Sequence, residues 1–351
     1  MVELYNKVSL ILDSLDFDCL WSGFRRYDFA LYNEKSVILK NKIFPHNNRF
    51  IGNTAIKFNG KYTAIWNISD YDGMDCEELV SNIVHEMFHA FQQEKNEERF
   101  PNDLIMLDYP NDLVNYQIKW DENKILAKIF QTDDVAQKEK LFAQFVSMRK
   151  KRVSLIGDMI LQEYLTETVE GIAEYVGTKA LQQISLDKYN ARISKYCQTL
   201  QTLDIDLFNI RRMSYYSGAL FGLAAKELNQ PLWHEIEKTT TTLFELIASN
   251  FSQVEFDCTY DQEVSCLFET YVKTKQSKID NFLNEHKERI TGDFTICGYD
   301  PMNMIKYNNL ILCEHFVILL DNSTEEKIQL FQPVLLEMKP DTTNIVTSYI
   351  L

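Results

Sequence analysis

The chain is organised around the stretch Val84-His85-Glu86-Met87-Phe88-His89-Ala90. In an α-helix, positions four apart lie one above the other, so the imidazoles of His85 and His89 project toward one point. Two histidines in this arrangement around a glutamate form a zinc site. Glu86 lies on the flank of the pair, where it can take a proton from a water that the metal has made acidic. A chain with 6 histidines in 351 residues carries this pattern by chance only about 0.008 times, so the stretch predicts a catalytic metal centre.

The residues around the histidine pair predict a helix that is packed in a core. Apolar residues follow two adjacent stripes at helical spacing, which leaves the histidines on the remaining face. Asp75, with Glu78 three residues later, is an N-terminal cap signal. We therefore expect a helix over 75–94. The two stripes consist of Leu79, Ile83, Met87 and Ala90, and of Val80, Val84, Phe88 and Phe91.

The chain on either side of this helix predicts an α+β protein. Residues 21–70 are β-rich, and Asn59-Gly60 favours a tight hairpin between strands 51–58 and 61–68. The second strand leads into the histidine helix through Asp70-Tyr71-Asp72-Gly73. Residues 111–250 have helical patterning throughout. Short strands are expected at 30–32 and 37–39, and helices at 1–20, 111–131, 134–156, 158–183, 186–200, 211–229 and 232–250.

The last hundred residues have a different pattern of predicted secondary structure. A β-like segment at 264–268, a short helix near 279–289 and strands from Phe294 to the end indicate a β-rich region over 251–351. We therefore expect one large catalytic domain over 1–250, followed by a small β-rich C-terminal module whose role the sequence does not reveal.

The composition limits the classes of function. The chain has 36 Lys and Arg against 51 Asp and Glu, a net charge of −15, which repels phosphate backbones and anionic membranes. It has neither a long apolar run nor a basic leader before an apolar core, so no membrane span or secretion signal is expected. Seven scattered cysteines without a CxxC pair are typical of reduced thiols. We expect a cytoplasmic protein that binds neither nucleic acid nor membrane.

A catalytic zinc needs a third protein ligand and an open fourth position. A third histidine six residues after His89 is absent, and Cys76, nine residues before His85, lies on the opposite face of the helix. A later helix instead offers four carboxylates at offsets of 0, 4, 7 and 11, which place them on one face opposite an apolar side. A divalent cation and nearby arginines would relieve their repulsion. The four carboxylates belong to Glu163, Glu167, Glu170 and Glu174, and the ligand choice between Glu167 and Glu170 stays open.

The segment Glu170-Gly171-Ile172-Ala173-Glu174-Tyr175 resembles the Glu-Gly-Phe-Ala segment of the gluzincins, especially the M1-type aminopeptidases. The resemblance implies that Glu170 is the third zinc ligand and that Glu174, one turn later, orients a zinc histidine. The 81 positions from His89 to Glu170 exceed the usual M1 spacing and imply an inserted helical segment. The Gly-x-Met-Glu-Asn motif that binds a free amine in M1 enzymes is absent. The implied activity is therefore peptide hydrolysis, with endo- or exo-cleavage open.

A second segment, Tyr215-Tyr216-Ser217-Gly218-Ala219, resembles the Tyr-x-x-Gly-Ala segment of M1-type enzymes. The resemblance implies that Tyr215 donates a hydrogen bond to the oxyanion. Tyr216 is the alternative, and simple packing beside Gly218 is the plainer interpretation of either tyrosine. By the same resemblance, strand 61–68 would pair with extended substrate. The expected substrate-binding residues are Ala64, Ile65 and Trp66.

Four arginines complete the candidate set. They could balance the Glu163 and Glu167 carboxylates or hold the C-terminal carboxylate of a peptide, although ordinary pairing on a helix surface is the plainer interpretation. The arginines are Arg149, Arg152, Arg211 and Arg212.

Together, these features predict a zinc metallopeptidase on a zincin-like domain, with Zn²⁺ as cofactor and a peptide or protein as substrate. Two alternatives remain. One is a non-catalytic binding protein that keeps zinc as a structural clamp. The other is a zinc hydrolase that acts on a non-peptide amide, ester or epoxide.

Overall fold

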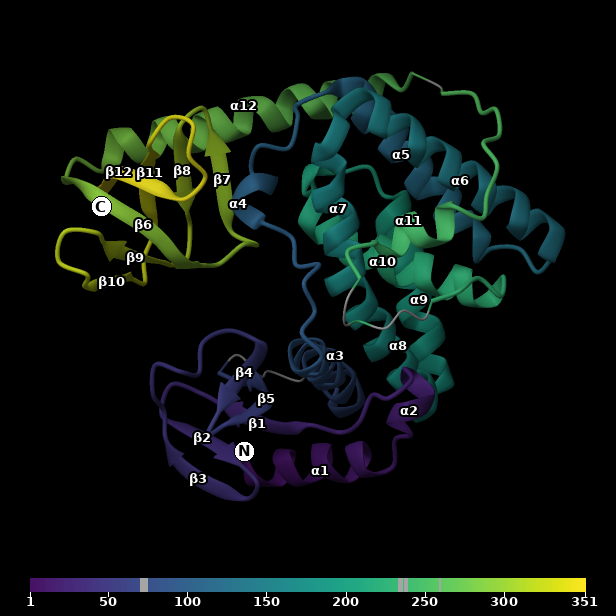
Figure 1. The fold of residues 1–351 in the computed structure, drawn as a ribbon, viewed down its shortest axis with the longest axis horizontal. Helices are drawn as coiled ribbons and strands as arrows, with labels where there is room; N and C mark the ends of the chain where they lie inside the picture. Colours follow the sequence, from purple (N-terminus) through teal and green to yellow (C-terminus); the bar gives the residue numbers. More distant parts are fainter. Residues whose placement is uncertain (70–74, 233–235, 237–238, 259) are drawn as a thin grey trace.

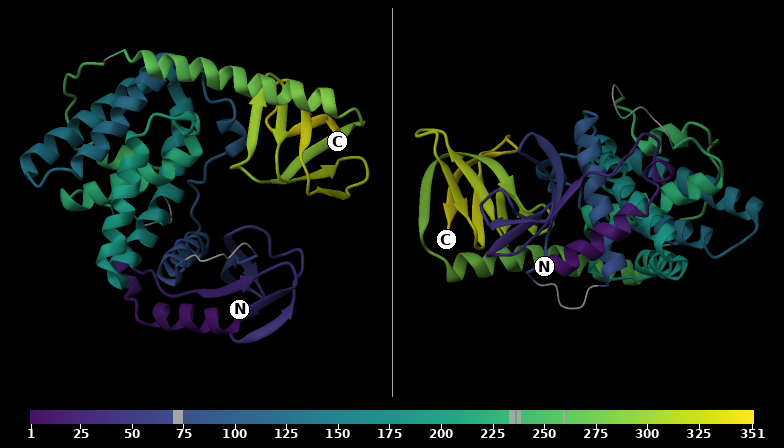
Figure 2. Two further views of the ribbon diagram at one scale, coloured as in Figure 1. Left: turned by 180° about the vertical axis from the view of Figure 1, so that it is seen from behind. Right: turned by 90° about the horizontal axis from the view of Figure 1, so that it is seen from below.

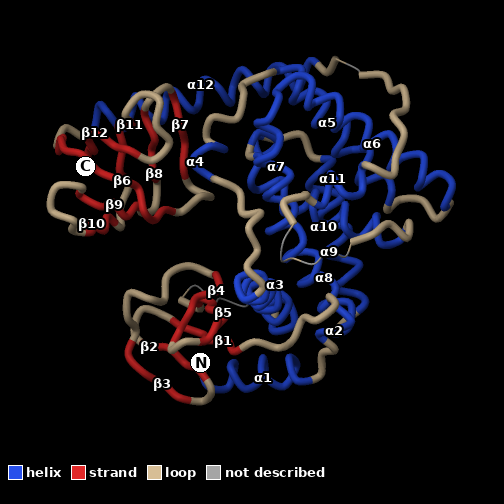
Figure 3. Tube along the Cα trace, in the orientation of Figure 1, coloured by secondary structure: helices blue, strands red, loops and turns tan. Residues whose placement is uncertain are grey.

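The computed structural model describes residues 1–69, 75–232, 236, 239–258 and 260–351, and within them the predicted α+β class is confirmed. Two β-sheets lie on one side of the molecule and a group of helices lies on the other (Figure 1; Figure 2, left). Coloured by secondary structure, the strands fall into these two separate groups (Figure 3). None of the helices in the described ranges combines the length and apolar character that crossing a bilayer requires.

The N-terminal part is a five-stranded sheet with two helices before it. Residues 1–20 form two helices, α1 (Val2–Asp13) and α2 (Phe17–Leu20), instead of the single one expected, because Asp16 caps a new helix through the backbone amide of Cys19. The strand order is β3-β2-β1-β5-β4. The strands are β1 (Asp28–Tyr32), β2 (Ser36–Leu39), β3 (Lys42–Pro45), β4 (Thr54–Phe58) and β5 (Lys61–Asn67).

The predicted hairpin is confirmed as β4 and β5, which pair antiparallel from Phe58 and Lys61 outward. Asn59 and Gly60 both adopt positive φ, at 48° and 80°, as a two-residue turn of this type requires. β5 also pairs with β1, in parallel. It is therefore an interior strand, and β4 is one of the two edge strands, with β3 at the other edge. The expected link 70–73 lies outside the described residues.

The histidine helix is α3 (Cys76–Glu94). Asp75 caps it as predicted, because its carboxylate accepts hydrogen bonds from the backbone amides of Glu77 and Glu78 at 2.9 and 3.4 Å. Both predicted apolar stripes are buried. One side of α3 packs on the sheet at β5 and the other on α8 (Ile172–Ile184). The histidines are thereby held between the sheet and the helical group.

The helical group follows the sequence predictions closely. Its longest members confirm the helices predicted at 111–131, 134–156, 186–200 and 211–229. The helix predicted at 158–183 contains a π-helical turn at Glu167–Gly171. The prediction at 232–250 includes residues outside the described ranges, and in the described part only Leu243–Ala248 (α11) is helical. The other helices are α4 (Asp103–Met106), α5 (Leu113–Ile129), α6 (Val135–Ile156), α7 (Ile160–Thr166), α9 (Leu186–Gln201) and α10 (Ile210–Glu227).

The β-like prediction at 264–268 is wrong, because these residues belong to the long helix α12 (Gln262–Glu285). Val264, Phe268 and Tyr271 follow helical spacing, and the rings of Phe268 and Tyr271 pack against Phe208. Tertiary packing thus overrides the β propensity of a short apolar run. The short helix expected near 279–289 is the end of the same α12, so the region 251–351 is β-rich only from Arg289 onward.

The C-terminal module is a seven-stranded antiparallel sheet in the order β10-β9-β6-β12-β11-β8-β7. The end of α12 packs on one face of it, where Ile279 and Phe282 contact Leu312 and Leu335. α12 therefore joins the module to the helical group (Figure 1). The strands are β6 (Arg289–Tyr299), β7 (Met304–Tyr307), β8 (Leu310–Cys313), β9 (Val317–Asp321), β10 (Lys327–Leu330), β11 (Val334–Met338) and β12 (Ile345–Ile350).

Candidate metal centre

α3 brings the two predicted histidine ligands together. Nε2 of His85 and Nε2 of His89 lie 3.0 Å apart, and the ring centroids are separated by 4.8 Å. The side chains are nearly buried, with exposed fractions of 7% and 8% for the two residues. Their spacing of one helical turn therefore aims both nitrogens at one point, as the sequence predicts.

Glu170 completes a set of three donor atoms. Its Oε2 lies 3.0 Å from Nε2 of His89 and 3.7 Å from Nε2 of His85. Ligands held tetrahedrally by zinc at about 2.0–2.1 Å are about 3.3 Å from one another. The three separations bracket this value, and in the described part of the chain these residues form the one cluster suited to a metal ion. Two imidazole nitrogens and one carboxylate oxygen at these separations are suited to hold a metal ion such as zinc.

The π-helical turn decides between Glu167 and Glu170. It inserts an extra residue into the helical repeat, so the four carboxylates predicted to share one face are divided between two. Glu163 and Glu167 are buried toward α5 and α6, where Glu167 pairs with Arg149. Glu170 and Glu174 face α3 instead. Glu170 therefore lies within reach of the histidine nitrogens, whereas Glu167 is paired on the opposite side.

The outer nitrogen of each imidazole is held by a second side chain. Nδ1 of His85 lies 2.9 Å from Oε2 of Glu174, the residue predicted for this role. Nδ1 of His89 lies 2.8 Å from Oε1 of Gln92, whose amide nitrogen donates to the carbonyl of Val169 at 3.1 Å. Partners of this kind fix the tautomer and ring angle of metal-binding histidines. The sequence interpretation missed Gln92, although its position three residues after His89 on the same helix is a usable signal.

The carboxylates around the histidines favour positive charge on or beside the two imidazoles. Burial lowers the pKa of His85, but hydrogen bonds to Glu170 and Glu174 outweigh burial and raise that pKa to about 10. Burial raises the pKa of Glu174, but its hydrogen bond to His85 outweighs this and lowers the pKa to about 2. A divalent cation between the three donor atoms would supply this positive charge in place of the protons.

Glu86 lies beside the donor atoms without being one of them. Its exposed fraction is 7%, and in the described part of the chain its carboxylate takes part in no ion pair or hydrogen bond. Burial raises its pKa, while the charges of His85 and His89 act in the opposite direction. A carboxylate that is unpaired and poorly solvated at such a point is suited to accept a proton.

Tyr215 and Arg211 close the other side of the centre. The ring of Tyr215 stacks on that of His85, with centroids 6.0 Å apart and an interplanar angle of 4°. Tyr216 faces Tyr196 instead, at 5.1 Å, so Tyr215 is the tyrosine at the centre. Burial and the nearby Glu170 carboxylate raise the pKa of Tyr215, which keeps its phenol protonated as a donor. Arg211 donates to Oε1 of Glu170 at 2.9 Å.

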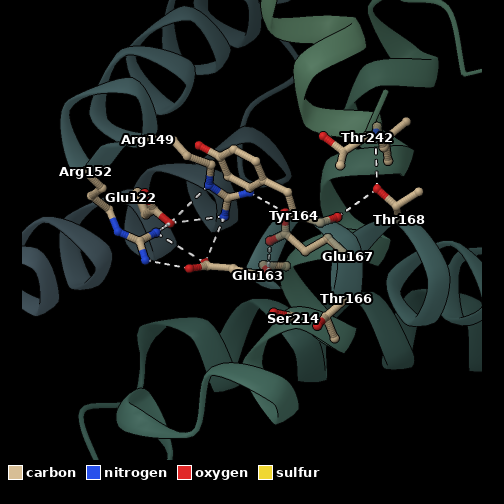
Figure 4. A network of polar contacts seen from close by, with 12 residues as sticks. Glu122, Arg149, Arg152, Glu163, Tyr164, Thr166, Glu167, Thr168, Ser214 and Thr242 are labelled. Carbon is tan, nitrogen blue, oxygen red and sulfur yellow. Dashed lines mark hydrogen bonds and ion pairs between the residues drawn. The ribbon is translucent and has the colours of Figure 1, made fainter. Parts of the chain in front are cut away.

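A buried ionic network lies behind the π-helical turn (Figure 4). Arg152 donates to Glu163 at 2.6 Å and Arg149 donates to Glu122 at 3.0 Å. Lys119 pairs with Glu163 at 2.6 Å. Arg149 and Arg152 do balance the Glu163 and Glu167 carboxylates, which was one of the possibilities. The plainer interpretation, pairing on a helix surface, is wrong for these two arginines because both are buried. The network consists of three cations, Lys119, Arg149 and Arg152, and three carboxylates, Glu122, Glu163 and Glu167.

Two glycines let α10 approach the π-helical turn closely. A Cβ on Gly218 would lie 2.7 Å from Cα of Gly171, and a Cβ on Gly171 would lie 2.6 Å from Cα of Gly218. Any larger residue at either position would push the helices apart. Ser217 of α10 also donates to the Glu167 carboxylate. The backbone that carries Glu170 is therefore fixed from both sides.

The predicted role of strand 61–68 in binding substrate through its backbone is wrong at Ala64 and Ile65 and stays a prediction at Trp66. Ala64 and Ile65 of β5 are paired with β1 on one side and β4 on the other, and Trp66 is paired with β1, so no backbone edge is free for a peptide at Ala64 and Ile65. Ala64 and Ile65 are also buried. The edge strand next to β5 is β4, the other strand of the hairpin, and β3 is the edge on the far side of the sheet.

No protein-family model, curated protein sequence or solved structure matches this chain. The residues of the candidate metal centre are therefore the basis for assigning a function.

Proposed function

We propose that this protein is a zinc-dependent peptidase in which His85, His89 and Glu170 hold the metal. The convergence of their three donor atoms at separations of 3.0, 3.0 and 3.7 Å carries the proposal. The resemblance of segments 170–175 and 215–219 to gluzincin motifs supports it. The sheet that packs on the helix bearing His85, Glu86 and His89 is also in keeping with a zincin-like domain.

Each residue at the centre has a task in peptide hydrolysis. When bound, zinc supplies the Lewis acidity that makes water acidic near neutral pH. Glu86 takes the proton from the attacking water and passes it to the leaving amine, since it has no competing partner among the described residues. Tyr215 donates a hydrogen bond to the developing oxyanion. An extended peptide pairs with the open edge of β4, next to α3.

The number of protein ligands favours a catalytic site over a structural clamp. Structural zinc sites use four protein ligands, whereas three converge here in the described part of the chain. Removal of the metal separates the two cases. A catalytic site is expected to lose activity on chelation while the circular dichroism stays largely unchanged, and a structural one to lose its fold.

Metal binding tests the ligand assignment directly. The purified protein is expected to hold about one zinc per chain. Glu170→Gln is expected to weaken zinc binding by about 100-fold or more, because even residues that only orient ligands contribute 10–100-fold. Competition with a chromogenic chelator measures this. Glu77→Gln, on the first turn of α3, where the side chain is partly exposed and pairs with Lys188, is the matched control and should bind zinc as the wild type does. Equal zinc affinity in both variants would remove Glu170 from the ligand set.

The two adjacent tyrosines give a matched pair for the oxyanion role. Tyr215→Phe is expected to lower kcat by about 10²-fold with little change in KM, as is typical when one oxyanion donor is lost. Tyr216→Phe, whose ring faces Tyr196 and not His85, should retain kcat within about twofold. Steady-state kinetics on one fluorogenic peptide decide the matter. Similar losses in both variants would show that the hydroxyl of Tyr215 has no special role.

A further inference from the structure

Two cavities lie side by side between the candidate metal centre and the C-terminal module. The outer cavity, of about 550 Å³, lies beside the centre, where Glu174 and Tyr215 line it. The inner cavity, of about 300 Å³, lies between α10, α12 and the loop and strand at 301–306. Arg212 and Met302 line both cavities. Arg211 lines the inner cavity and also donates to the Glu170 carboxylate, so the inner cavity lies next to the centre.

The inner cavity is positively charged in a strongly acidic protein. Five basic and three acidic residues line it, and the outer cavity adds two of each sign. The whole chain has a net charge of −15, which repels acidic ligands at long range. The positive charge of this cavity is therefore a local property of the site, opposite in sign to the charge of the whole protein.

Among the described residues, Lys275 is the one cation lining the inner cavity for which no acidic partner is seen. Arg211, Arg212 and Lys278 pair with the three acidic residues of the cavity wall. The Lys275 ammonium instead contacts the hydroxyl of Tyr271 at 3.3 Å and lies 4.8 Å from the centre of the same ring. In the described part of the chain it forms no ion pair.

The surroundings of Lys275 leave its charge uncompensated. Burial lowers its pKa, and Asp108 only partly opposes this effect. Asp108 is itself paired with Lys306, at 2.6 Å. Apolar side chains such as Met106, Ile210 and Met304 form other parts of the cavity wall. A half-buried ammonium in such a setting gains most from a ligand that brings its own negative charge.

We propose that the inner cavity binds a carboxylate of the peptide substrate, with Lys275 as its counter-ion. This inference rests on the proposed peptidase function and names its substrate class as acidic peptides. The carboxylate is that of an Asp or Glu side chain or of a free C-terminus. The C-terminal module thereby gains a role, since Met302, Met304 and Lys306 form one wall of the recognition site.

Binding to an inactive variant tests the proposal separately from catalysis. Zinc-loaded Glu86→Gln protein is titrated with fluorescent peptides in matched pairs, in which Asp or Glu replaces Asn or Gln at one position and the C-terminus is free or amidated. Adding Lys275→Gln is expected to raise the Kd of acidic peptides about tenfold and to leave neutral peptides unchanged. Lys275→Arg should restore most of the affinity. Lys273→Gln is the control, because Lys273 lies on the same helix but is 77% exposed and pairs with Glu269.

The results separate the two proposals. If Lys275→Gln raises the Kd tenfold only for peptides with a free C-terminus and not for amidated ones, the ligand is the C-terminal carboxylate. If the rise is confined to peptides with Asp or Glu in place of Asn or Gln, the ligand is an acidic side chain. Equal weakening of acidic and neutral peptides by Lys275→Gln, or no weakening, overturns the inference. Cleavage by active protein without acid preference also overturns it while the peptidase proposal stands. Lys275-dependent binding of acidic peptides that the active protein never cleaves supports the cavity and rejects the peptidase.

Discussion

Glu86→Gln is expected to lower kcat/KM for peptide hydrolysis by about 10³-fold, within the range that positioned acid–base groups contribute. Glutamine has nearly the same shape as glutamate but cannot accept the proton of the attacking water. Glu86 contributes no donor atom to the cluster formed by His85, His89 and Glu170, so zinc content should remain at the wild-type value. Metal analysis and peptide kinetics on the same preparation measure both quantities.

The control for this prediction lies on the same helix. Glu77→Gln removes a carboxylate from the first turn of α3, where it pairs with Lys188 on the surface, and should leave kcat/KM within about twofold. If Glu86→Gln cleaved peptides as fast as the wild type, the assignment of the base would be wrong. If it lost both activity and zinc, Glu86 would belong to the metal site and not to the acid–base chemistry.

Arg152→Met is expected to lower the free energy of unfolding by about 3–5 kcal/mol, the range seen when one partner of a buried ion pair is removed. The guanidinium donates to Glu163 at 2.6 Å, to Asn115 at 2.9 Å and to the hydroxyl of Tyr109 at 2.6 Å. Its loss leaves carboxylates of the network buried with too little positive charge. Equilibrium unfolding in urea measures the effect.

Lys151→Met is the matched control, because Lys151 is the adjacent residue on α6 and is exposed. A change within about 0.5 kcal/mol is expected there. A second variant, Arg152→Met with Glu163→Gln, should lose less stability than the two single changes added together, since each removes part of the other's penalty. Strict additivity would contradict the description of these residues as one coupled network.

The network also explains how Glu170, the proposed metal ligand, is held in place. Glu167 and Glu170 lie in the same π-helical turn, and the first is fixed by Arg149 and Ser217 while the second faces the histidines. The close contact of Gly171 with Gly218 fixes the same turn from α10. The position of Glu170 therefore depends on residues that never touch the metal site.

The parts of this protein that depend on local patterns could be predicted from the sequence. The helix that carries His85 and His89, its cap at Asp75 and the Asn59-Gly60 hairpin follow from helical periodicity and turn chemistry, which act over a few residues. The pairing of Glu170 with the histidines could be proposed because motif resemblance supplied long-range information that periodicity lacks.

Contacts between distant segments were decided by the tertiary structure alone. The run at 264–268 is helical, with Phe268 packed on Phe208. Ala64 and Ile65 of β5 cannot pair with a peptide through their backbone, because both edges of β5 are paired there within the sheet. Gln92, the network around Arg152 and the cavity at Lys275 likewise depend on which elements are neighbours. Local sequence thus determined which groups could do the chemistry, whereas burial and packing determined which of them meet, because these energies arise between residues far apart in the chain.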